Sequence, residues 1–368
     1  MIDVKRYISG MKVSFEKWKI IYAEYKGCQF HPYYLDQLLT GKFTLLNPAL
    51  VAPYHLGNKN KHRTIALIVL DLKWVQTAGF FALFHRTLCA LYFSDKMGFV
   101  PVVANWDMCA YEEDHAIFGT KNVFEYYFKQ PASCSVEDAL YSNTVIIPSN
   151  NNMDLILFEY QSAWYELSDK YISKMGEIYR KYIHFNDRIN NEIEKDIEET
   201  IGNKKTLGIH FRGADFRLNA NGHPVSLTIN DYFPYINKAL KQNNYEQIFV
   251  ATDDTKALTN LKKRYNNITF FSDVLRTTGD VSVAFLENNR KNHKYRLGYE
   301  VLRDAFALAS CDGLIAGHSQ VAVGARIMKA SDKKEFKYLK IIEKGINHNS
   351  NDWVNIYETT IKKRKKTM

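Results

Sequence analysis

Short apolar runs alternate with amphipathic stretches over most of the chain, and this alternation predicts an α/β fold. The apolar runs at 64–72 and 100–104 predict buried strands, and residues 77–97 between them carry apolar positions at helical spacing. A strand, a helix and a second strand within about 40 residues are typical of a parallel sheet. Residues 143–148 predict a further short strand, and residues 155–197 are expected to be helical.

A second and more regular alternation begins at residue 206. Polar residues follow each of its first four apolar runs. Because the carboxyl ends of parallel strands meet at one edge of a sheet, we expect these polar side chains to converge on one crevice. The predicted strands are Thr206–Phe211, Gln247–Ala251, Ile268–Phe271, Gly313–Ala316 and Tyr338–Ile342, with helices at Asn230–Gln242, Thr255–Tyr265, Arg296–Cys311 and Val321–Lys329.

The length of the chain favours two domains. Its 368 residues exceed what one ordinary hydrophobic core holds. We place an amino-terminal α/β domain at residues 1–190 and a carboxyl-terminal Rossmann-like domain at 191–345. Residues 346–368 are expected to form a helix with a basic tail. The predicted architecture is therefore two doubly wound, Rossmann-like domains that face a cleft.

Positive charge is concentrated at the carboxyl terminus. The formal net charge is +9, and residues 362–366 read Lys-Lys-Arg-Lys-Lys. Such a block is either a solvated helix end or a patch attracted to anionic lipid headgroups, at about 1 kcal/mol per basic residue near the surface. No recognised nucleic-acid module is visible, which disfavours nucleic acid as a partner. We favour the solvated helix end, and peripheral membrane contact through the tail stays open as the second interpretation.

The cysteines and the amino terminus predict a cytoplasmic location. The five cysteines are scattered without a CxxC pair, which favours reduced core thiols over zinc ligands. Asp3 and the lack of a long apolar segment at the start argue against a signal peptide. The apolar run Ile65–Leu70 is far shorter than the ~20 residues that span a bilayer. We therefore expect any membrane contact to be peripheral and to occur at the inner face of the membrane.

The stretch His210-Phe-Arg212-Gly-Ala-Asp215 follows a predicted buried strand and carries the strongest chemical signal. It places a fixed cation and a carboxylate at the sheet edge where open α/β sheets bind ligands. The planar fork of donors on arginine suits a diphosphate. A structural salt bridge between Arg212 and Asp215 is the alternative role for these two side chains.

Three segments together resemble one enzyme family. The stretch just described resembles the His-x-Arg-x-x-Asp motif of α1,6-, α1,2- and protein O-fucosyltransferases. Residues 250–254, Val-Ala-Thr-Asp-Asp, resemble a segment of the α1,6 and bacterial nodulation branch. Residues 304–315, followed by Ser319-Gln320-Val321, are similar to that branch's third motif. The three occur in the family's order over roughly residues 205–330, and together they imply the GT-B architecture.

This resemblance implies a site for a GDP-sugar donor, with the donor as substrate and no metal or other cofactor. Arg212 would contact the β-phosphate, where negative charge develops as the diphosphate leaves. Asp304 would accept two parallel donors of guanine, although the helix macrodipole alone would also favour a carboxylate there. Asp254 either caps the following helix or contacts the ligand. The remaining donor-side candidates are His210, Asp253, Ser319 and Gln320.

The general base is less well marked than the donor site. The α1,6 branch carries a Glu five residues beyond the motif's Asp, and this chain has Ala220 there. Two nearby titratable residues, His223 and Asp215, are the candidates for that role.

Candidate acceptor contacts lie in the amino-terminal half. Trp106, Asp107 and Glu125 offer an aromatic face and acids suited to a sugar, but core packing accounts for most of the aromatic residues there equally well.

The resemblance thus implies an inverting transferase that moves fucose from GDP-fucose to a hydroxyl of a glycan or a lipid-linked oligosaccharide. The expected setting is surface polysaccharide synthesis. Two alternatives stay open: a transferase for another GDP-sugar, such as a heptose or mannose, and a catalytically silent basic adaptor that binds membranes or nucleic acid.

Overall fold

The computed structural model describes residues 53–163, 166–286 and 288–350, and the chain divides into two compact units that interleave along the sequence. The first unit takes in Arg86–Ala104, Gln130–Tyr182 and the described residues up to Val69. The second takes in Leu70–His85, Asn105–Lys129 and the described residues from Ile183 onwards. The predicted basic block at 362–366 lies outside the described residues, and the predicted domain boundaries at 190 and 345 stay a prediction.

The first unit is built on a three-stranded parallel sheet with strand order β2-β1-β3. Its central strand is apolar along its whole length and fully buried, as expected of a strand covered on both faces. Two of its helices, α6 and α7, begin with a serine capping box at Ser135 and Ser149. The elements are β1 (Ile65–Ile68), β2 (Val100–Val103), α6 (Val136–Leu140), β3 (Val145–Ile146), α7 (Asn150–Glu159) and α8 (Asp169–Tyr182), with the later part of α5 (Phe80–Met97).

The second unit is built on a five-stranded parallel sheet with strand order β6-β5-β4-β7-β8. From β4 the chain proceeds outward to β5 and β6, then returns through α12 to β7 on the other side of β4. The strand order therefore reverses between β4 and β7. The elements are α4 (Leu72–Val75), η2 (Phe124–Tyr126), α9 (Asp187–Thr200), β4 (Thr206–Phe211), η3 (Ala214–Leu218), η4 (Ile229–Asp231), α10 (Phe233–Gln242), β5 (Gln247–Thr252), α11 (Thr255–Arg264), β6 (Ile268–Thr269), η5 (Val283–Phe285), α12 (His293–Ser310), β7 (Gly313–Gly317), α13 (Gln320–Ser331) and β8 (Tyr338–Ile342), with the start of α5.

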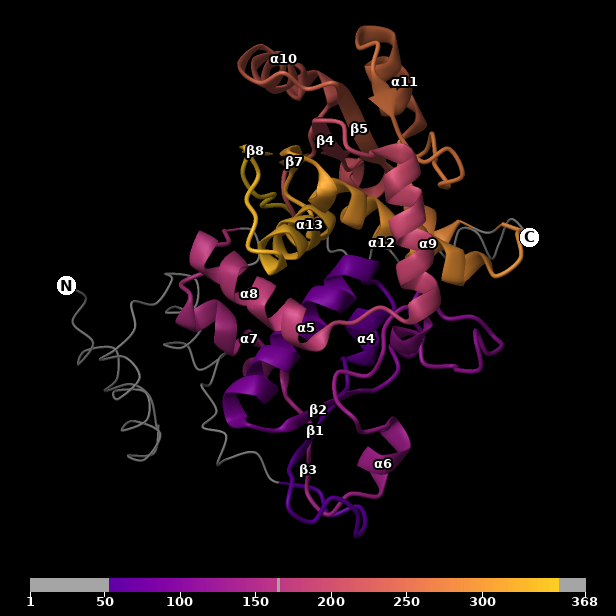
Figure 1. The fold of residues 1–368 in the computed structure, drawn as a ribbon, viewed down its shortest axis with the longest axis vertical. Helices are drawn as coiled ribbons and strands as arrows, with labels where there is room; N and C mark the ends of the chain where they lie inside the picture. Colours follow the sequence, from indigo (N-terminus) through magenta and orange to yellow (C-terminus); the bar gives the residue numbers. More distant parts are fainter. Residues whose placement is uncertain (1–52, 164–165, 287, 351–368) are drawn as a thin grey trace, which may run out of the picture. The chain divides into compact units, whose positions relative to one another are not determined.

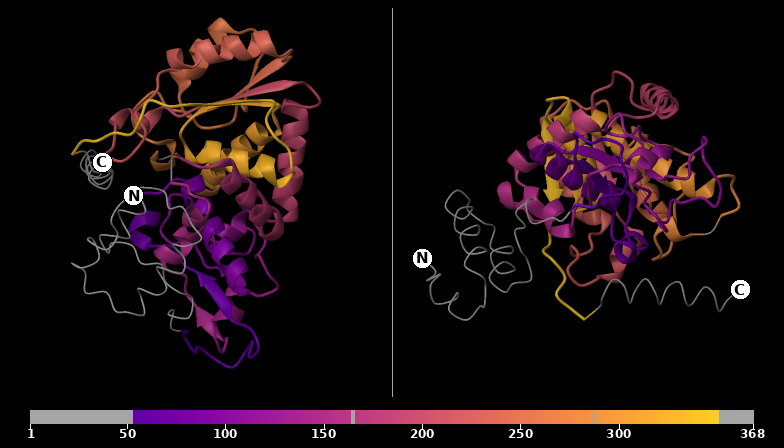
Figure 2. Two further views of the ribbon diagram at one scale, coloured as in Figure 1. Left: turned by 90° about the vertical axis from the view of Figure 1, so that its left-hand side faces the viewer. Right: turned by 90° about the horizontal axis from the view of Figure 1, so that it is seen from below.

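Alternate residues of β4 face opposite layers of helices. Leu207, Ile209 and Phe211 join a core with apolar residues of α10 and α11. On the other face, Gly208 lies against Leu308 and Cys311 at the end of α12. Figures 1 and 2 show the same layering, with α10 and α11 on one side of the sheet and α12 and α13 on the other. The predicted α/β class, with doubly wound parallel sheets, is confirmed.

Several predicted boundaries differ from the structure. The predicted helix start at Asn230 is wrong. Thr228 and Asp231 form a capping box around the short helix η4, and α10 starts later, at Phe233, with a proline in its first turn. The predicted helical stretch 155–197 consists of three helices, since α7, α8 and α9 each begin and end within or beside it. Among the residues that the structure describes, no helix combines the length and apolarity needed to cross a membrane.

Candidate functional site

The carboxyl ends of β4 and β5 bring two of the predicted residues into direct contact. Arg212 follows β4, Asp253 follows β5, and the guanidinium Nη1 lies 3.0 Å from the carboxylate Oδ2. Nη2 of Arg212 donates to the Ser282 hydroxyl over a longer distance of 3.4 Å. Asp253 is therefore a carboxylate partner of Arg212, and the predicted Arg212–Asp215 pair stays a prediction. The Asp215 side chain lies outside the described part of the structure.

Asp253 and Asp254 both hold backbone in place. Asp253 Oδ1 accepts the Gly213 N–H at 2.9 Å. Asp254 Oδ1 accepts the N–H groups of Lys256 and Ala257 at 2.7 and 3.0 Å, which makes it the N-cap of α11. The capping role that the sequence allows for Asp254 is thus the one it fills here.

Arg217 belongs to the same cluster, although nothing in the sequence marks it. It pairs with Asp254 and with Asp280, and it donates to the Gly279 carbonyl. Arg212 therefore pairs with Asp253, and Arg217 pairs with the adjacent carboxylate of Asp254. The partners of Arg217 lie 37 and 63 residues further along the chain, so no local pattern reveals this contact.

Gly213 is required by the close approach of Asp254. A Cβ at Gly213 would lie 2.6 Å from Asp254 Oδ2 and 2.7 Å from its Cβ, closer than real side chains come. The absence of a side chain lets the chain turn from Arg212 toward η3 directly beside the N-terminus of α11. This glycine therefore couples the position of Arg212 to the cap of the neighbouring helix.

His210 and Ser319 meet where the strand order reverses. His210 lies near the end of β4, Ser319 follows β7, and the His210 Nδ1 and Ser319 Oγ atoms are 3.1 Å apart. Ser319 also caps α13 by accepting the Ala322 N–H at 3.1 Å. Burial, with a smaller contribution from the nearby Arg212 cation, lowers the pKa of His210 to about 3. The ring is therefore neutral at physiological pH, and its Nδ1 shares a hydrogen bond with the serine hydroxyl.

Gln320, the first residue of α13, makes a contact that the sequence does not predict. Its Oε1 lies 2.7 Å from Nδ1 of His85 on α5. The amide oxygen is thus engaged within the protein, while the N-terminus of α13 carries the positive end of the helix dipole. A topological switch point next to a helix N-terminus is where open α/β sheets bind anionic groups.

Asp304 is buried on α12 with an unsatisfied oxygen. The residue is 7% exposed, and its Oδ1 has no hydrogen-bond partner among the described residues. Burial raises the pKa of the carboxyl to about 7, against the opposing effect of Arg276 and then Arg303. A buried polar atom without a partner is unfavourable, so a ligand that donates to this carboxylate would stabilise it.

The candidate base His223 is half-buried, and its ring lies edge-on to Phe216 at a centroid distance of 6.3 Å. Its carbonyl accepts the Asn347 N–H at 2.8 Å. The structure thus places His223 beside η3, the short helix that follows Arg212. Its role as the base stays a prediction, as does that of Asp215.

Core packing accounts for the aromatic member of the predicted acceptor set. Trp106 is 1% exposed and packs against Phe80 and Phe124, with centroid distances of 5.5 and 5.8 Å. An enclosed ring has no face on which a sugar can stack, so burial overrides the expectation for this residue. Asp107 accepts a hydrogen bond from the Asn105 amide at 2.6 Å, and Glu125 accepts one from the Thr120 hydroxyl at 2.8 Å.

The described residues hold no group of three or more His, Cys, Asp or Glu side chains that could bind a metal ion. The adjacent Asp253 and Asp254 carboxylates instead face the two arginines and backbone N–H groups.

Comparison with known proteins points to one family. Residues 167–337 match the family model described as the alpha-(1,6)-fucosyltransferase N- and catalytic domains. No curated protein matches the chain. Solved structures similar to it include the NodZ α1,6-fucosyltransferase soaked with GDP-fucose, with 18% identity, a TM-score of 0.46, and coverage of 73% of this chain and 93% of that one. The fucosyltransferase NodZ from Bradyrhizobium is 17% identical, with a TM-score of 0.45, and the match covers 73% of this chain and 93% of that one. POFUT1 in complex with GDP-fucose is 10% identical, with a TM-score of 0.44, and the match covers 77% of this chain and 98% of that one.

The matched segment contains every donor-side residue predicted above, from His210 to Gln320. Residues 167–337, slightly less than half of the chain, are therefore similar to the catalytic domain of the α1,6-fucosyltransferases.

Proposed function

We propose that the protein is an inverting glycosyltransferase that moves fucose from GDP-fucose to a hydroxyl of a glycan or of a lipid-linked oligosaccharide. The observation that carries the proposal is the position of Arg212. It stands at the carboxyl end of the central strand β4, within the family motif, and Asp253 orients its guanidinium. The switch point between β4 and β7 lies beside it.

Arg212 and the N-terminus of α13 would hold the diphosphate. The arginine fork matches two phosphate oxygens, and the interaction strengthens as negative charge develops on the leaving GDP. The helix N-terminus that Ser319 caps adds partial positive charge. Because these groups neutralise the diphosphate, we propose that transfer needs no metal, and activity is expected to persist in EDTA.

Asp304 would read the base. Guanine presents N1–H and its exocyclic amine side by side, and one carboxylate can accept both. Adenine lacks this pair of adjacent donors, so the contact selects for guanine. The unsatisfied carboxylate oxygen of Asp304 is consistent with a site that a ligand completes.

In the transfer step, the acceptor oxygen forms a bond to C1 of fucose as the bond from C1 to the β-phosphate oxygen breaks. The electron pair of that bond leaves with GDP, and the acceptor's proton passes to a base. His210 does not fit this role, because its pKa of about 3 makes it a weak proton acceptor at neutral pH. His223 and Asp215 are the proposed candidates.

The proposed setting is surface polysaccharide synthesis in the cytoplasm, with peripheral contact at the inner face of the membrane. This part rests on the basic residues 362–366 and on the family resemblance. A transferase for GDP-heptose or GDP-mannose would share the same diphosphate and guanine contacts, and donor profiling separates the three sugars.

The test is calorimetric binding and hydrolysis of GDP-fucose, GDP-mannose and GDP-heptose by the purified protein. We expect GDP-fucose to bind and Arg212→Ala to weaken binding by roughly 10- to 100-fold, the equivalent of one charged hydrogen-bonding group. Arg188→Ala, which removes an exposed arginine paired with Glu192 on α9, is the matched control. If no GDP-sugar binds, or if Arg212→Ala binds as tightly as wild type, the proposal fails.

A further inference from the structure

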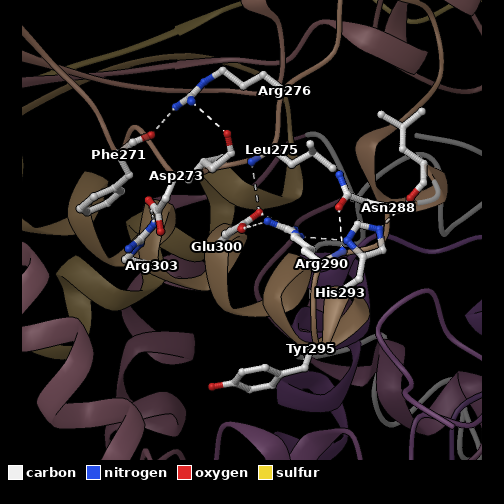
Figure 3. A network of polar contacts seen from close by, with 12 residues as sticks. Phe271, Asp273, Leu275, Arg276, Asn288, Arg290, His293, Tyr295, Glu300 and Arg303 are labelled. Carbon is white, nitrogen blue, oxygen red and sulfur yellow. Dashed lines mark hydrogen bonds and ion pairs between the residues drawn. The ribbon is translucent and has the colours of Figure 1, made fainter.

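A network of charged side chains surrounds Asp304 on α12, and most of its members are paired. Arg303 contacts the carboxylates of Asp196 and Asp273, each at 2.6 Å. Glu300 pairs with Arg290 through two guanidinium nitrogens and accepts the Leu275 N–H. Figure 3 shows the Arg303–Asp273 and Glu300–Arg290 pairs, which join α12 to the connection that precedes it.

Arg276 and Asp304 are the two charged groups of this network that lack an ion-pair partner among the described residues. Arg276 donates to the carbonyls of Phe271 and Val274, at 2.9 and 3.1 Å, and these bonds fix its guanidinium (Figure 3). Within the described part of the chain, its Nε is buried without a hydrogen-bond partner, as is Oδ1 of Asp304. Two bonds place the remaining cation near the remaining carboxylate: the Leu275 N–H, next to Arg276, bonds to Glu300, one helical turn before Asp304 on α12, and Asp273 pairs with Arg303 beside Asp304. The opposite charges of Arg276 and Asp304 therefore interact.

We propose that Arg276 is a positioning residue that keeps the buried Asp304 carboxylate ionised, and therefore able to bind the base of the donor. This inference rests on the proposed function, in which Asp304 accepts the guanine donors. Arg276 itself need not touch the ligand.

The physical reason is the cost of burying a charge. Desolvation favours the neutral form of a carboxyl group, and an opposite charge nearby offsets that preference. Among the charges around Asp304, Arg276 has the largest lowering effect on its pKa. Arg303 also lowers it, but its charge is already compensated by two carboxylates. A guanidinium held by backbone carbonyls cannot swing into solvent, so its charge stays effective.

Arg276 is also tied to the diphosphate half of the site. The next residue, Thr277, donates its N–H to the Asp253 carbonyl at 2.8 Å and accepts the Thr255 N–H at 3.0 Å. Asp253 is the residue that orients Arg212. One short connection therefore supports both ends of the proposed donor site.

The test measures GDP-fucose affinity by calorimetry from pH 5.5 to 8.5. Neither phosphate of GDP-fucose carries a proton that titrates in this range, so the protein supplies the pH dependence. Wild-type affinity is expected to fall below a midpoint near pH 7, where the Asp304 carboxyl takes up a proton. Arg276→Met should move the midpoint upward by about one unit, which makes binding about tenfold weaker at pH 6 and close to wild type at pH 8.5.

Three further variants identify the cause. Arg276→Lys keeps the positive charge, and its affinity should fall at a midpoint pH close to that of wild type. Asp304→Asn should bind GDP-fucose weakly at every pH. This result would show that the pH dependence comes from Asp304. The other charged or titratable groups nearby are Arg303, Glu300 and Asp273, which face it, and His293, which bonds to Arg290. Arg264→Met removes an arginine stacked on Phe233, as Arg276 stacks on Phe270, and should leave the profile unchanged.

Circular dichroism verifies that each variant folds, and Arg276→Gln replaces the Met variant if the latter does not. A loss of affinity that is the same at every pH would mean that Arg276 is merely structural, and an unchanged midpoint would also overturn the inference. In both cases the proposed function would stand. Wild-type protein that binds no GDP-fucose at any pH would overturn the proposed function and this inference together.

Discussion

Replacing Gly213 by alanine tests how tightly the arginine at the end of β4 is coupled to the neighbouring helix. The added methyl group would lie 2.6 Å from Asp254 Oδ2 and 2.7 Å from Asp254 Cβ. Asp254 cannot move away freely, because it caps α11 through two backbone N–H groups and pairs with Arg217. The variant must therefore shift either the cap or the backbone that follows Arg212.

The size of the effect follows from these two possibilities. Loss of an N-cap costs about 0.5–2 kcal/mol, and forcing an extra methyl group into a packed site costs about 1–3 kcal/mol. The two terms share one carboxylate and do not add fully. We expect Gly213→Ala to lower the free energy of unfolding by about 2–3 kcal/mol. Displacement of Arg212 should also weaken GDP-fucose binding about tenfold or more.

Urea unfolding followed by circular dichroism gives the stability, and calorimetry gives the affinity. Gly79→Ala is the control, since a Cβ there meets nothing within 4 Å, and its effect should be within about 0.5–1 kcal/mol. Combining Gly213→Ala with Asp254→Ser, which keeps a capping oxygen on a shorter side chain, should cost less than the sum of the two single changes. Wild-type stability and affinity in Gly213→Ala would refute the close approach, and normal affinity with reduced stability would refute the coupling to Arg212.

Two further predictions concern the second unit. As the pH is lowered below about 6.5, the free energy of unfolding should decrease. His210 contributes up to about 1.4 kcal/mol per pH unit to this decrease, because the unfolded chain takes up a proton that the buried ring, with a pKa of about 3, does not. His210→Asn should lack this component, so its stability deficit relative to wild type should shrink from pH 7.5 to pH 4.5; a constant deficit would contradict the effect of burial on the ring. Gly324→Ala in α13 should lower the urea midpoint strongly, since its Cβ would lie 2.2 Å from a ring carbon of Phe81, and the double variant with Phe81→Leu should recover part of the loss; an unchanged midpoint in the single variant would show that the ring can yield.

The central strand and its polar end could be predicted from the sequence. All six residues of β4 are buried, and a continuous apolar run that ends in His-x-Arg is typical of a central strand in an α/β sheet whose carboxyl end faces a ligand. The capping role of Asp254 is also accessible, because a carboxylate directly before an amphipathic stretch is a local signal. These features depend on neighbours within a few residues.

Features that depend on distant partners could not be predicted. Trp106 follows a strand and resembles a sugar-stacking residue, but its surroundings, Phe80 and Phe124, come from separate segments. The predicted start of α10 at Asn230 is wrong. Asparagine is a good N-cap residue, but Thr228 forms a capping box that starts the short helix η4 first. Arg217 carries no local signal, because its carboxylate partners are brought close only by the fold. Arg276 bonds to carbonyls only two and five residues away, but the carboxyl group that its charge affects, Asp304, lies far along the chain on α12.

The two arginines that follow β4 illustrate why a motif residue and a nearby residue of the same type have different roles. Arg217 pairs with a carboxylate that is already fixed as a helix cap, and it also holds Asp280 and the Gly279 carbonyl, so any ligand that drew it away would disturb α11. Arg212 pairs with Asp253, whose other oxygen holds the Gly213 N–H, and its contact to Ser282 is long. Exchange of these two contacts for a diphosphate would leave the bond between Asp253 and the Gly213 N–H in place. The proposed roles, donor binding for Arg212 and structural support for Arg217, agree with what these partners do elsewhere in the fold.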